Sequence, residues 1–375
     1  MKKKILTILG TRPEIIRLSC IIKKIDNYFV NILVNTNQNY DKNLNLVFFK
    51  ELNLSPPKYN FPKKKFLNSI NFISNTLIQI DKILAFEKPD AVLVLGDTNT
   101  ALSVLCAKKR NIPIFHIEAG NRCYDQRVPE EINIVLVDKI SDINLVYSDV
   151  AKQNLIKENF DLDKIIKIGS PLFEVFKENH VRIENSNILK KLNLTEKKYI
   201  LLSCHREENV DKFNNLSQII LATKKIAKKF NLKIIFSIHP RTKDKIKKAN
   251  KSMLKNIINH KPFGFFDYIK LQMNSKLTIS DSGSIVEESN ILNFAAINIR
   301  ETTERQEGME KGFAVLSGLK INDIVSSAEI VLKRFSNKPR LDIHKDYFEE
   351  HVSDKVINAI QSYIPYINRK VWFKY

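Results

Sequence analysis

Seven short apolar runs in the sequence end in residues that carry a charge, a hydroxyl group or an imidazole ring. These run ends are Gly10–Glu14, Gly96–Thr98, His116–Gly120, His205–Glu208, His239–Arg241, Asp281–Ser284 and Arg300–Arg305. Asp97, Glu118 and the nearby Glu130 could act as general acids and bases, because clustered carboxylates raise one another's pKa. The alternative is that each carboxylate caps a helix or pairs with a neighbouring lysine or arginine.

Gly10–Glu14 has the features of a turn that binds an anion. Pro13 suits the first position of a helix, whose N-terminus offers free amides, and Arg12 would add a bidentate donor. The stretch is also compatible with an ordinary strand-to-helix turn that carries a surface arginine. It lacks the three glycines of a dinucleotide fingerprint.

A second anion site is predicted at Asp281–Ser289. Ser282, Gly283 and Ser284 could present amides and hydroxyls to a diphosphate. Glu288, about one helical turn later, could accept hydrogen bonds from a ribose diol. Simple capping of the helix by the first two residues of the stretch is the alternative.

The histidines and paired aspartates favour no metal chemistry. His205 follows an apolar run and could serve as an acid or base, although a lone histidine is more often structural. His116 lies within a strongly apolar run, which favours a role in the core or in support of a site. Asp161 and Asp163 have metal-pair spacing but lie in a polar loop, so we expect no metal site.

The segments that must position these residues alternate between short apolar runs and helix-length amphipathic stretches. Strands are predicted at 5–9, 30–34, 91–95, 112–117 and 143–147, and in a second series at 199–203, 234–238, 277–280 and 296–299. This alternation is typical of parallel sheets with helices on both faces. A polar stretch near 176–196 separates the series, so we predict two doubly wound α/β domains joined by a short linker. Ligands bind at the C-terminal strand ends of such sheets, which predicts a cleft between the domains as the active site.

The composition and net charge of the chain limit the kinds of partner and location that we expect for the protein. The 375 residues carry 61 Lys plus Arg against 41 Asp plus Glu, a formal net charge of +20. The lysines are spread over helix-like stretches, so we expect a solvated surface and no nucleic-acid partner. The four cysteines have neither metal nor redox-pair spacing and suggest a reducing compartment. We expect no membrane span, and a cytoplasmic location.

The ordered set of motifs resembles the non-hydrolysing UDP-N-acetylglucosamine 2-epimerase family. The matching stretches span nearly the whole chain: Gly10–Glu14, Gln38–Asp41, Gly96–Thr98, His116–Gly120, Pro129–Asn133, His205–Glu208, Asp281–Gly283 with Glu287–Glu288, and Thr302–Arg305. The resemblance implies two Rossmann-like domains in a GT-B arrangement, 1–172 and 173–351, and a homodimer. It also implies that a helix within 352–375 returns to the first domain.

By this resemblance the protein inverts carbon 2 of a UDP-2-acetamido sugar. That carbon carries no acidic proton, so the family eliminates UDP to form a 2-acetamidoglucal and adds it back with the proton on the other face. The reaction needs acid–base groups on both faces of the sugar and cations near the departing UDP. It needs neither NAD nor a metal, and we expect no cofactor. The products would be precursors of surface polysaccharides.

The resemblance also implies roles for individual residues. The catalytic set is Asp97, Glu118, Glu130 and His205. The UDP-binding set is Arg12, Tyr268 beside the uracil, Ser282, Gly283, Ser284, Glu288 on the ribose, and Arg305.

The sequence departs from the family pattern in five places. Asn37 and Ser284 replace glycines, Ile134 an arginine, Lys139 a histidine and Gln306 a proline. Ile134, one helical turn after Glu130, would slow the enzyme unless Arg122 or Arg127 supports that carboxylate instead.

The stretch 120–131 looks closer to a side branch that acts on rarer UDP-sugars, such as those leading to N-acetyl-L-fucosamine or to diacetamido uronic acids. Two other functions remain open from the residues. One is a GT-B glycosyltransferase that uses a UDP-sugar donor, and the other is a basic nucleic-acid-binding protein.

Overall fold

The chain folds into two compact units. The computed structural model describes residues 2–38, 45–210, 213–238, 242–243, 246, 251–310, 312, 315–337 and 342–374. Unit 1 comprises Met1–Glu178 and Lys345–Tyr375, and unit 2 comprises Asn179–His344. The expected motifs His239–Arg241 and the end of Gln38–Asp41 lie outside the described residues.

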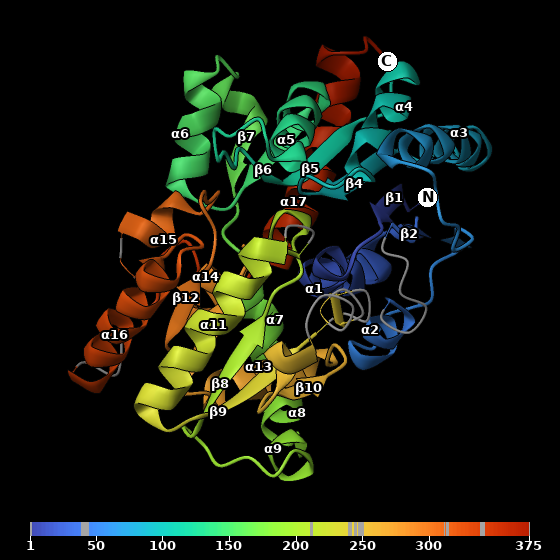
Figure 1. Cartoon of the computed structure of the whole chain (residues 1–375). Helices are drawn as coiled ribbons and strands as arrows, with labels where there is room; N and C mark the ends of the chain where they lie inside the picture. The colour runs from blue at the N-terminus through green and yellow to red at the C-terminus, as the bar shows by residue number, and fades with distance from the viewer. Residues whose placement is uncertain are drawn as a thin grey trace. The chain divides into compact units, whose positions relative to one another are not determined.

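Over its described residues, unit 1 is built on a seven-stranded sheet in the order β3-β2-β1-β4-β5-β6-β7 (Figure 1). The strands are β1 Lys4–Leu9, β2 Val30–Asn35, β3 Tyr59–Asn60, β4 Ala91–Leu95, β5 Ile114–Ala119, β6 Ile143–Val146 and β7 Ile165–Lys167. All neighbouring strands are parallel, and every residue of β4 is buried. A central strand covered on both faces therefore reads as a continuous apolar run, as the sequence predicted.

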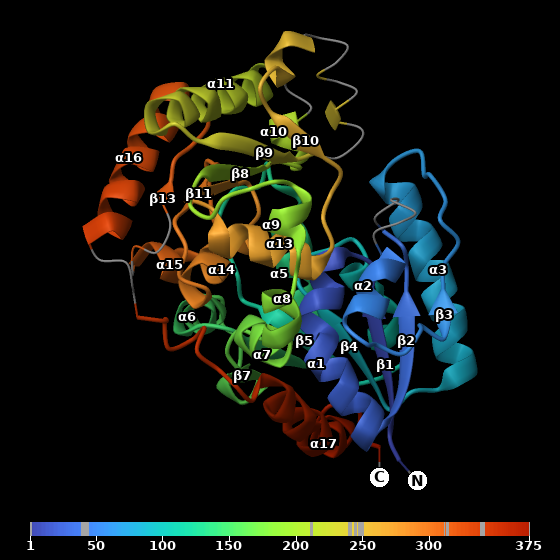
Figure 2. The same ribbon diagram turned by 90° about the horizontal axis from the view of Figure 1, so that it is seen from below.

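Helices cover both faces of this sheet. They are α1 Arg12–Tyr28, α2 Asn45–Glu51, α3 Ser69–Glu87, α4 Val104–Lys109, α5 Pro129–Ile140, α6 Asp149–Lys157, α7 Leu172–Glu178 and α17 Val352–Lys370, with 3₁₀ turns at Ala101–Ser103 and Leu162–Lys164. α17 packs against α1, where Lys24 and Asp354 form an ion pair of 2.6 Å (Figure 2). The last helix of the chain is thus part of unit 1.

In the part of unit 2 that the structure describes, a six-stranded parallel sheet has the order β10-β9-β8-β11-β12-β13. The strands are β8 Tyr199–Ser203, β9 Lys233–Ser237, β10 Ile258–His260, β11 Leu277–Ser280, β12 Ala296–Asn298 and β13 Val315–Leu316. The helices are α8 His180–Glu184, α9 Ile188–Lys191, α10 Glu207–Val210, α11 Phe213–Phe230, α13 Phe265–Asn274, α14 Ile285–Ile291, α15 Gln306–Glu310 and α16 Ile321–Asn337, with a 3₁₀ turn at Lys251–Leu254. The stretch near 176–196 is not a linker, because α8 and α9 belong to unit 2 and Ile188 is buried in its core.

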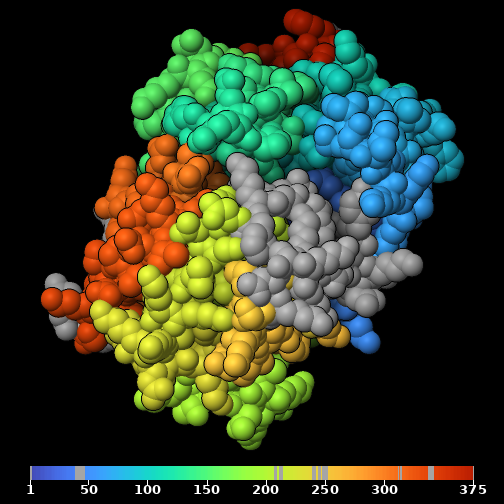
Figure 3. All heavy atoms as spheres, in the orientation of Figure 1, coloured from blue at the N-terminus to red at the C-terminus, as the bar shows by residue number. Residues whose placement is uncertain are grey.

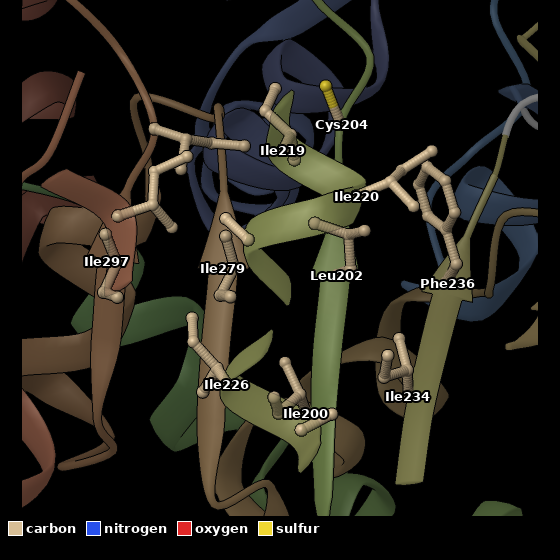
Figure 4. Packing of buried hydrophobic residues seen from close by; sticks show 14 of the residues in the cluster. Ile200, Leu202, Cys204, Ile219, Ile220, Ile226, Ile234, Phe236, Ile279 and Ile297 are labelled. Atoms are coloured by element: carbon tan, nitrogen blue, oxygen red, sulfur yellow. The ribbon is translucent and has the colours of Figure 1, made fainter. Parts of the chain in front are cut away.

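The core of unit 2 lies between its sheet and the helices α11 and α16. Leu202, Phe236 and Ile279 project from three neighbouring strands into this cluster, and Ile219 and Ile220 meet them from α11 (Figure 4). The outer face of α11 lies at the surface of the unit (Figure 3, yellow). Apolar residues therefore occupy one side of this helix, as its amphipathic sequence requires.

None of the helices that the structure describes is both long and apolar enough to cross a bilayer.

Candidate active site

The polar run ends of unit 1 converge where strands β1 and β4 lie side by side. The chain leaves these two strands toward opposite faces of the sheet, which is the switch point where α/β sheets bind ligands. The hydroxyl of Thr98, after β4, donates to Glu14, after β1, over 3.0 Å. The turns that follow the two strands are therefore joined directly.

The turn that carries Asp97 is held by helix α5. The side-chain amide of Asn133 donates to the carbonyl of Asp97 over 2.9 Å and to Asn99 Oδ1 over 3.0 Å. Asp97 itself is half-buried. Asn133 belongs to the Pro129–Asn133 motif, so one helix links two of the stretches that the sequence singled out.

Glu118 occupies a β-bulge at the end of β5. Pairing of β5 with β6 shifts register between Ile117 and Ala119, and Glu118 has φ of 70°. A bulge re-aims the extra side chain, and left-handed backbone at a non-glycine residue costs about 1 kcal/mol. A Cβ placed on Gly96 would lie 3.6 Å from Glu118 Oε2, so Glu118 lies beside the turn of Asp97.

Two further groups contact the carboxylate of Glu118. The Nε of Arg17, on α1, lies 3.8 Å from Glu118 Oε2. The side-chain amide of Asn121 donates to Oε1 over 3.4 Å. Glu118 therefore stands between a cation and an amide, in reach of the turn after β4.

The adjacent Glu130 and Glu131 at the start of α5 lie in different surroundings. Glu131 is buried and accepts the amides of Cys123 and Tyr124 over 2.9 and 3.0 Å, which fixes the loop before the helix. Glu130 is half-buried. Ile134, one turn on, is only 3% exposed, so it is a packed core residue of α5.

Arg122 and Arg127, which the sequence offered in place of an arginine at position 134, each bind other carboxylates. Arg122 is buried and binds Asp138 and Glu158, and Arg127 pairs with Asp125 at 2.8 Å. Burial opposes the charge of Arg122, but Glu158 and Asp138 raise its pKa well above the usual range. Arg122 is thus held by two carboxylates inside unit 1. The prediction that it supports Glu130 is wrong.

The turn after β1 differs from the expected open anion site. Glu14 accepts the amides of Gly10 and Thr11 over 2.9 and 2.7 Å, and the Thr11 hydroxyl over 2.8 Å. These two amides, which precede the first helical residue Arg12, are not free for a ligand, whereas the anion contact expected of Arg12 stays a prediction. Burial raises the pKa of Glu14 to about 7, although the hydrogen bonds from Gly10, Thr11 and Thr98 oppose the shift. Arg12 lies with its guanidinium 5.8 Å from the centre of the Phe48 ring.

In unit 2 the run ends meet at the corresponding switch point, between β8 and β11. His205 Nδ1 lies 3.0 Å from Asp281 Oδ1, and the side chain of His205 is 48% exposed. Asp281 also accepts the amides of His205 and Arg206 and the side chain of Asn209. Burial opposes the charge of Asp281, but His205 and these donors hold its pKa well below the usual range. The contact between Nδ1 and Asp281 fixes the orientation of the His205 ring, and Nε2 is the nitrogen that this contact does not use.

The predicted diphosphate and ribose residues form one hydrogen-bonded chain. The hydroxyls of Ser282 and Ser284 lie 2.9 Å apart, and Ser284 donates to Glu288 Oε1 over 2.7 Å. Gln272 donates to the other oxygen of Glu288 over 2.6 Å. Ser284 has φ of −68°, so its backbone does not require the glycine usual in the family.

At Gly283 a Cβ would overlap Glu304 Oε1, so a side chain here would displace that carboxylate. Arg300 binds Glu304 over 2.6 Å. Burial would raise the pKa of Glu304, but Arg300, Arg206 and Arg305 lower it to about 2. Arg300 and Glu304 were present in the Arg300–Arg305 motif but were not selected, because sequence alone does not show which charges meet.

Two of the predicted UDP-binding residues are largely or partly buried. Arg305 is 1% exposed and pairs with the buried Glu287 at 2.8 Å. Tyr268, on α13, is half-buried against a cluster that includes Phe263 and Leu271. The partner of Arg305 was not visible in the sequence, because an ion pair between two separate elements leaves no local pattern.

The aspartate pair dismissed as a metal site has partners of its own. Asp163 accepts from Tyr366 and Lys370, both on α17. Among the described residues, no cluster of histidine, cysteine, aspartate or glutamate could hold a metal ion.

Two parallel α/β units with acids at one switch point and hydroxyls and arginines at the other define a class of Rossmann-like, two-domain enzymes. The model of the UDP-N-acetylglucosamine 2-epimerase family matches residues 23–361, and the chain belongs to this family. The resemblance seen in the sequence is therefore confirmed.

Individual relatives match over nearly their whole length. The UDP-N-acetylglucosamine 2-epimerase of Rickettsia bellii is 42% identical, with 100% of both chains covered and a TM-score of 0.91. The UDP-GlcNAc 2-epimerase of Methanocaldococcus jannaschii, solved with UDP-GlcNAc and UDP, is 35% identical over 96% of this chain and 99% of that one, with a TM-score of 0.88. The UDP-2,3-diacetamido-2,3-dideoxy-D-glucuronate 2-epimerase of Pseudomonas aeruginosa is 32% identical over 88% of this chain and 92% of its own.

Proposed function

We propose that this protein is an isomerase that inverts carbon 2 of a UDP-2-acetamido sugar. Membership of the 2-epimerase family and the relatives that bind or act on such sugars support this function. The observation that carries it is the bulged Glu118 beside the turn of Asp97. A strained backbone that points a carboxylate at a switch point is typical of a functional residue.

The proposed reaction begins with elimination. One carboxylate removes the proton from carbon 2 while the C1–O bond breaks and UDP departs, which leaves a 2-acetamidoglucal. UDP then adds back to carbon 1 as a group on the opposite face returns a proton to carbon 2. Asp97, Glu118, Glu130 and His205 are the proposed acids and bases, and the Asp281 hydrogen bond keeps His205 in one orientation.

Unit 2 is proposed to hold the nucleotide. Ser282, Gly283 and Ser284 would contact the diphosphate, and Glu288 would accept from the ribose, since Gln272 and Ser284 already orient its carboxylate. Tyr268 would lie beside the uracil. Arg12 and Arg305 complete the set, and the burial of Arg305 beside Glu287 favours an action through the local potential rather than direct contact.

The sugar is the finer part of the proposal. UDP-GlcNAc and UDP-ManNAc are the first pair to test, and a UDP-2,3-diacetamido uronic acid is the second, because relatives of both kinds match this chain. A cytoplasmic homodimer that supplies polysaccharide precursors is proposed with it.

Incubation with UDP-GlcNAc in D₂O, followed by proton NMR, tests this function. Epimerisation forms the C2 epimer, incorporates deuterium at carbon 2 and leaves no accumulating free UDP. A glycosyltransferase would incorporate no deuterium, and a hydrolysing enzyme would release UDP steadily. Failure with UDP-GlcNAc and with the diacetamido sugar would contradict the proposal.

A further inference from the structure

His116 is a fully buried histidine whose two ring nitrogens both face acceptors. It lies in β5 and has 0% exposure. Nδ1 lies 2.8 Å from Asp138 Oδ1 of helix α5, and Nε2 lies 2.9 Å from the carbonyl oxygen of Gly96. A carbonyl oxygen only accepts, so Nε2 must carry a proton.

The surroundings of Asp138 leave one of its oxygens for the other ring nitrogen. Asp138 Oδ2 accepts from Arg122 over 2.8 Å and from the amide of Gly120 over 3.1 Å. Its Oδ1 pairs with Nδ1 of His116, so one proton lies between these two groups. The ring thus joins Asp138 to the Gly96 carbonyl through both of its nitrogens.

The neighbours of Asp138 are also paired. Arg122 uses Nε and its second terminal nitrogen to bind Glu158 over 2.7 and 2.8 Å. Lys139 places its Nζ 2.9 Å from the Glu158 carbonyl and 3.9 Å from the centre of the Phe160 ring. The polar groups of this cluster thus have partners, which is the condition for burying them at tolerable cost.

We propose that His116 and Asp138 form a clamp that positions the two turns carrying Asp97 and Glu118. His116 holds the carbonyl of Gly96, the residue before Asp97, and Asp138 holds the amide of Gly120, two residues after Glu118. Gly96 and Gly120 have φ of 70° and 78°, so both turns depend on left-handed backbone that the clamp fixes. The kinetic consequence rests on the proposed function, whereas the hydrogen bonds of the clamp do not.

Asp138→Asn tests the clamp, with Asp142→Asn as its matched control. Asp142 is also buried in unit 1, but it accepts from the amide of Ile114 and from Lys108, at the start of β5. We expect Asp138→Asn to lower kcat about tenfold to a hundredfold with KM changed less than about twofold, since small misplacements of reacting groups are that costly. Asp142→Asn should lose stability and keep its kcat. Equal kcat in the two variants would overturn the positioning role.

Nitrogen-15 NMR of the wild-type protein labelled at histidine gives a readout independent of activity and of variant folding. The chain has seven histidines. We expect one histidine whose Nε2 proton exchanges slowly with solvent, because His116 is buried and hydrogen-bonded to Gly96, and in Asp138→Asn that signal should change. If no histidine Nε2 proton is protected from exchange, the clamp as described is wrong. A wild-type protein that shows the protected Nε2 proton but no epimerisation would contradict the proposed function and leave the clamp standing.

Discussion

Carboxylates at the two switch points are treated in opposite ways by their surroundings. In unit 1, burial raises the pKa of Glu14 to about 7. In unit 2, burial acts on Asp281 and Glu304 too, but His205 lowers the pKa of Asp281, and Arg300, Arg206 and Arg305 lower that of Glu304 to about 2. Corresponding turns thus hold a carboxyl group that titrates near neutral pH in unit 1 and carboxylates that stay ionised in unit 2.

This difference shows where the chemistry of each unit is encoded. Parallel strands and their order place the turns, whereas the residues after each strand set the charge. Burial without a nearby cation favours the neutral acid, whereas His205 and the arginines favour the ionised carboxylate. The proposed function assigns the acid–base step to unit 1 and the diphosphate, which needs cations that stay charged, to unit 2.

The largest expected effect is a kinetic difference between variants in unit 1 and variants in unit 2. Asp97→Asn or Glu118→Gln should lower kcat about a hundredfold or more, because a positioned acid or base is lost, with UDP affinity nearly unchanged. Ser282→Ala should instead raise KM about tenfold and spare kcat. Steady-state rates and UDP calorimetry measure both, and the division of tasks is wrong if Ser282→Ala mainly lowers kcat.

The second effect concerns pH and stability. Because the pKa of Glu14 is raised, the folded protein keeps a proton that the unfolded chain releases, and the free energy of unfolding should fall by about 3 kcal/mol between about pH 4.5 and pH 7 from this group. Glu14→Gln should remove this fall in urea titrations across that range.

Glu87→Gln is the control of opposite sign for that measurement. Burial opposes the charge of Glu87, but its hydrogen bonds with Lys58 and Tyr59 hold its pKa below the usual value. It therefore contributes stability that is lost as the pH falls. Parallel pH profiles for Glu14→Gln and the wild type would contradict the raised pKa.

A third effect probes the fixed charges of unit 2. Gly283→Ala would bring a Cβ against Glu304, which is held by Arg300, so the turn must shift or the ion pair must open. UDP affinity should fall about tenfold, which is about 1.4 kcal/mol. Gly318→Ala, where φ is 67° and no atom lies within 4 Å of the added Cβ, should weaken stability alone. Equal UDP affinity in both variants would remove Gly283 from the binding turn.

The smallest effect is a difference in stability between two variants that both lose the carboxylate. Glu118→Gly should be about 0.5–1 kcal/mol more stable than Glu118→Ala, because glycine adopts the φ of 70° without strain. Ala119→Gly, one residue on, should destabilise by a similar amount. Chemical denaturation measures the three variants, and equal stability of Glu118→Gly and Glu118→Ala would mean that the bulge is not strained.

Sequence patterns predicted the central strands of both sheets but not the outer strands. The nine predicted strands all exist, and three of them have the bounds expected. The four that were missed, β3, β7, β10 and β13, are the outer strands of the two sheets, with two or three residues each. Outer strands are covered less completely, so they leave no continuous apolar run.

The remaining differences from the sequence predictions have both local and long-range causes. The spacing of Thr11 and Glu14 fits a capping box, and the bonds from Glu14 to the amides of Gly10 and Thr11 take up donors that a ligand could otherwise use. Asn37 has φ of 53°, a conformation that asparagine tolerates better than other side chains, so its replacement of glycine is explained by backbone geometry. The partners of His116 come from β4 and α5, far apart in sequence, and only the folded chain brings them together.

The return of α17 to unit 1 has a consequence for synthesis of the protein. Lys3 binds Gln361, Lys24 binds Asp354, and Glu174 accepts from Ser353, so unit 1 lacks part of its packing until the last helix is made. Unit 2 is continuous in sequence, and all of its residues leave the ribosome earlier. Unit 1, the proposed site of proton transfer, is therefore completed after unit 2, the proposed nucleotide-binding unit, is already available to fold.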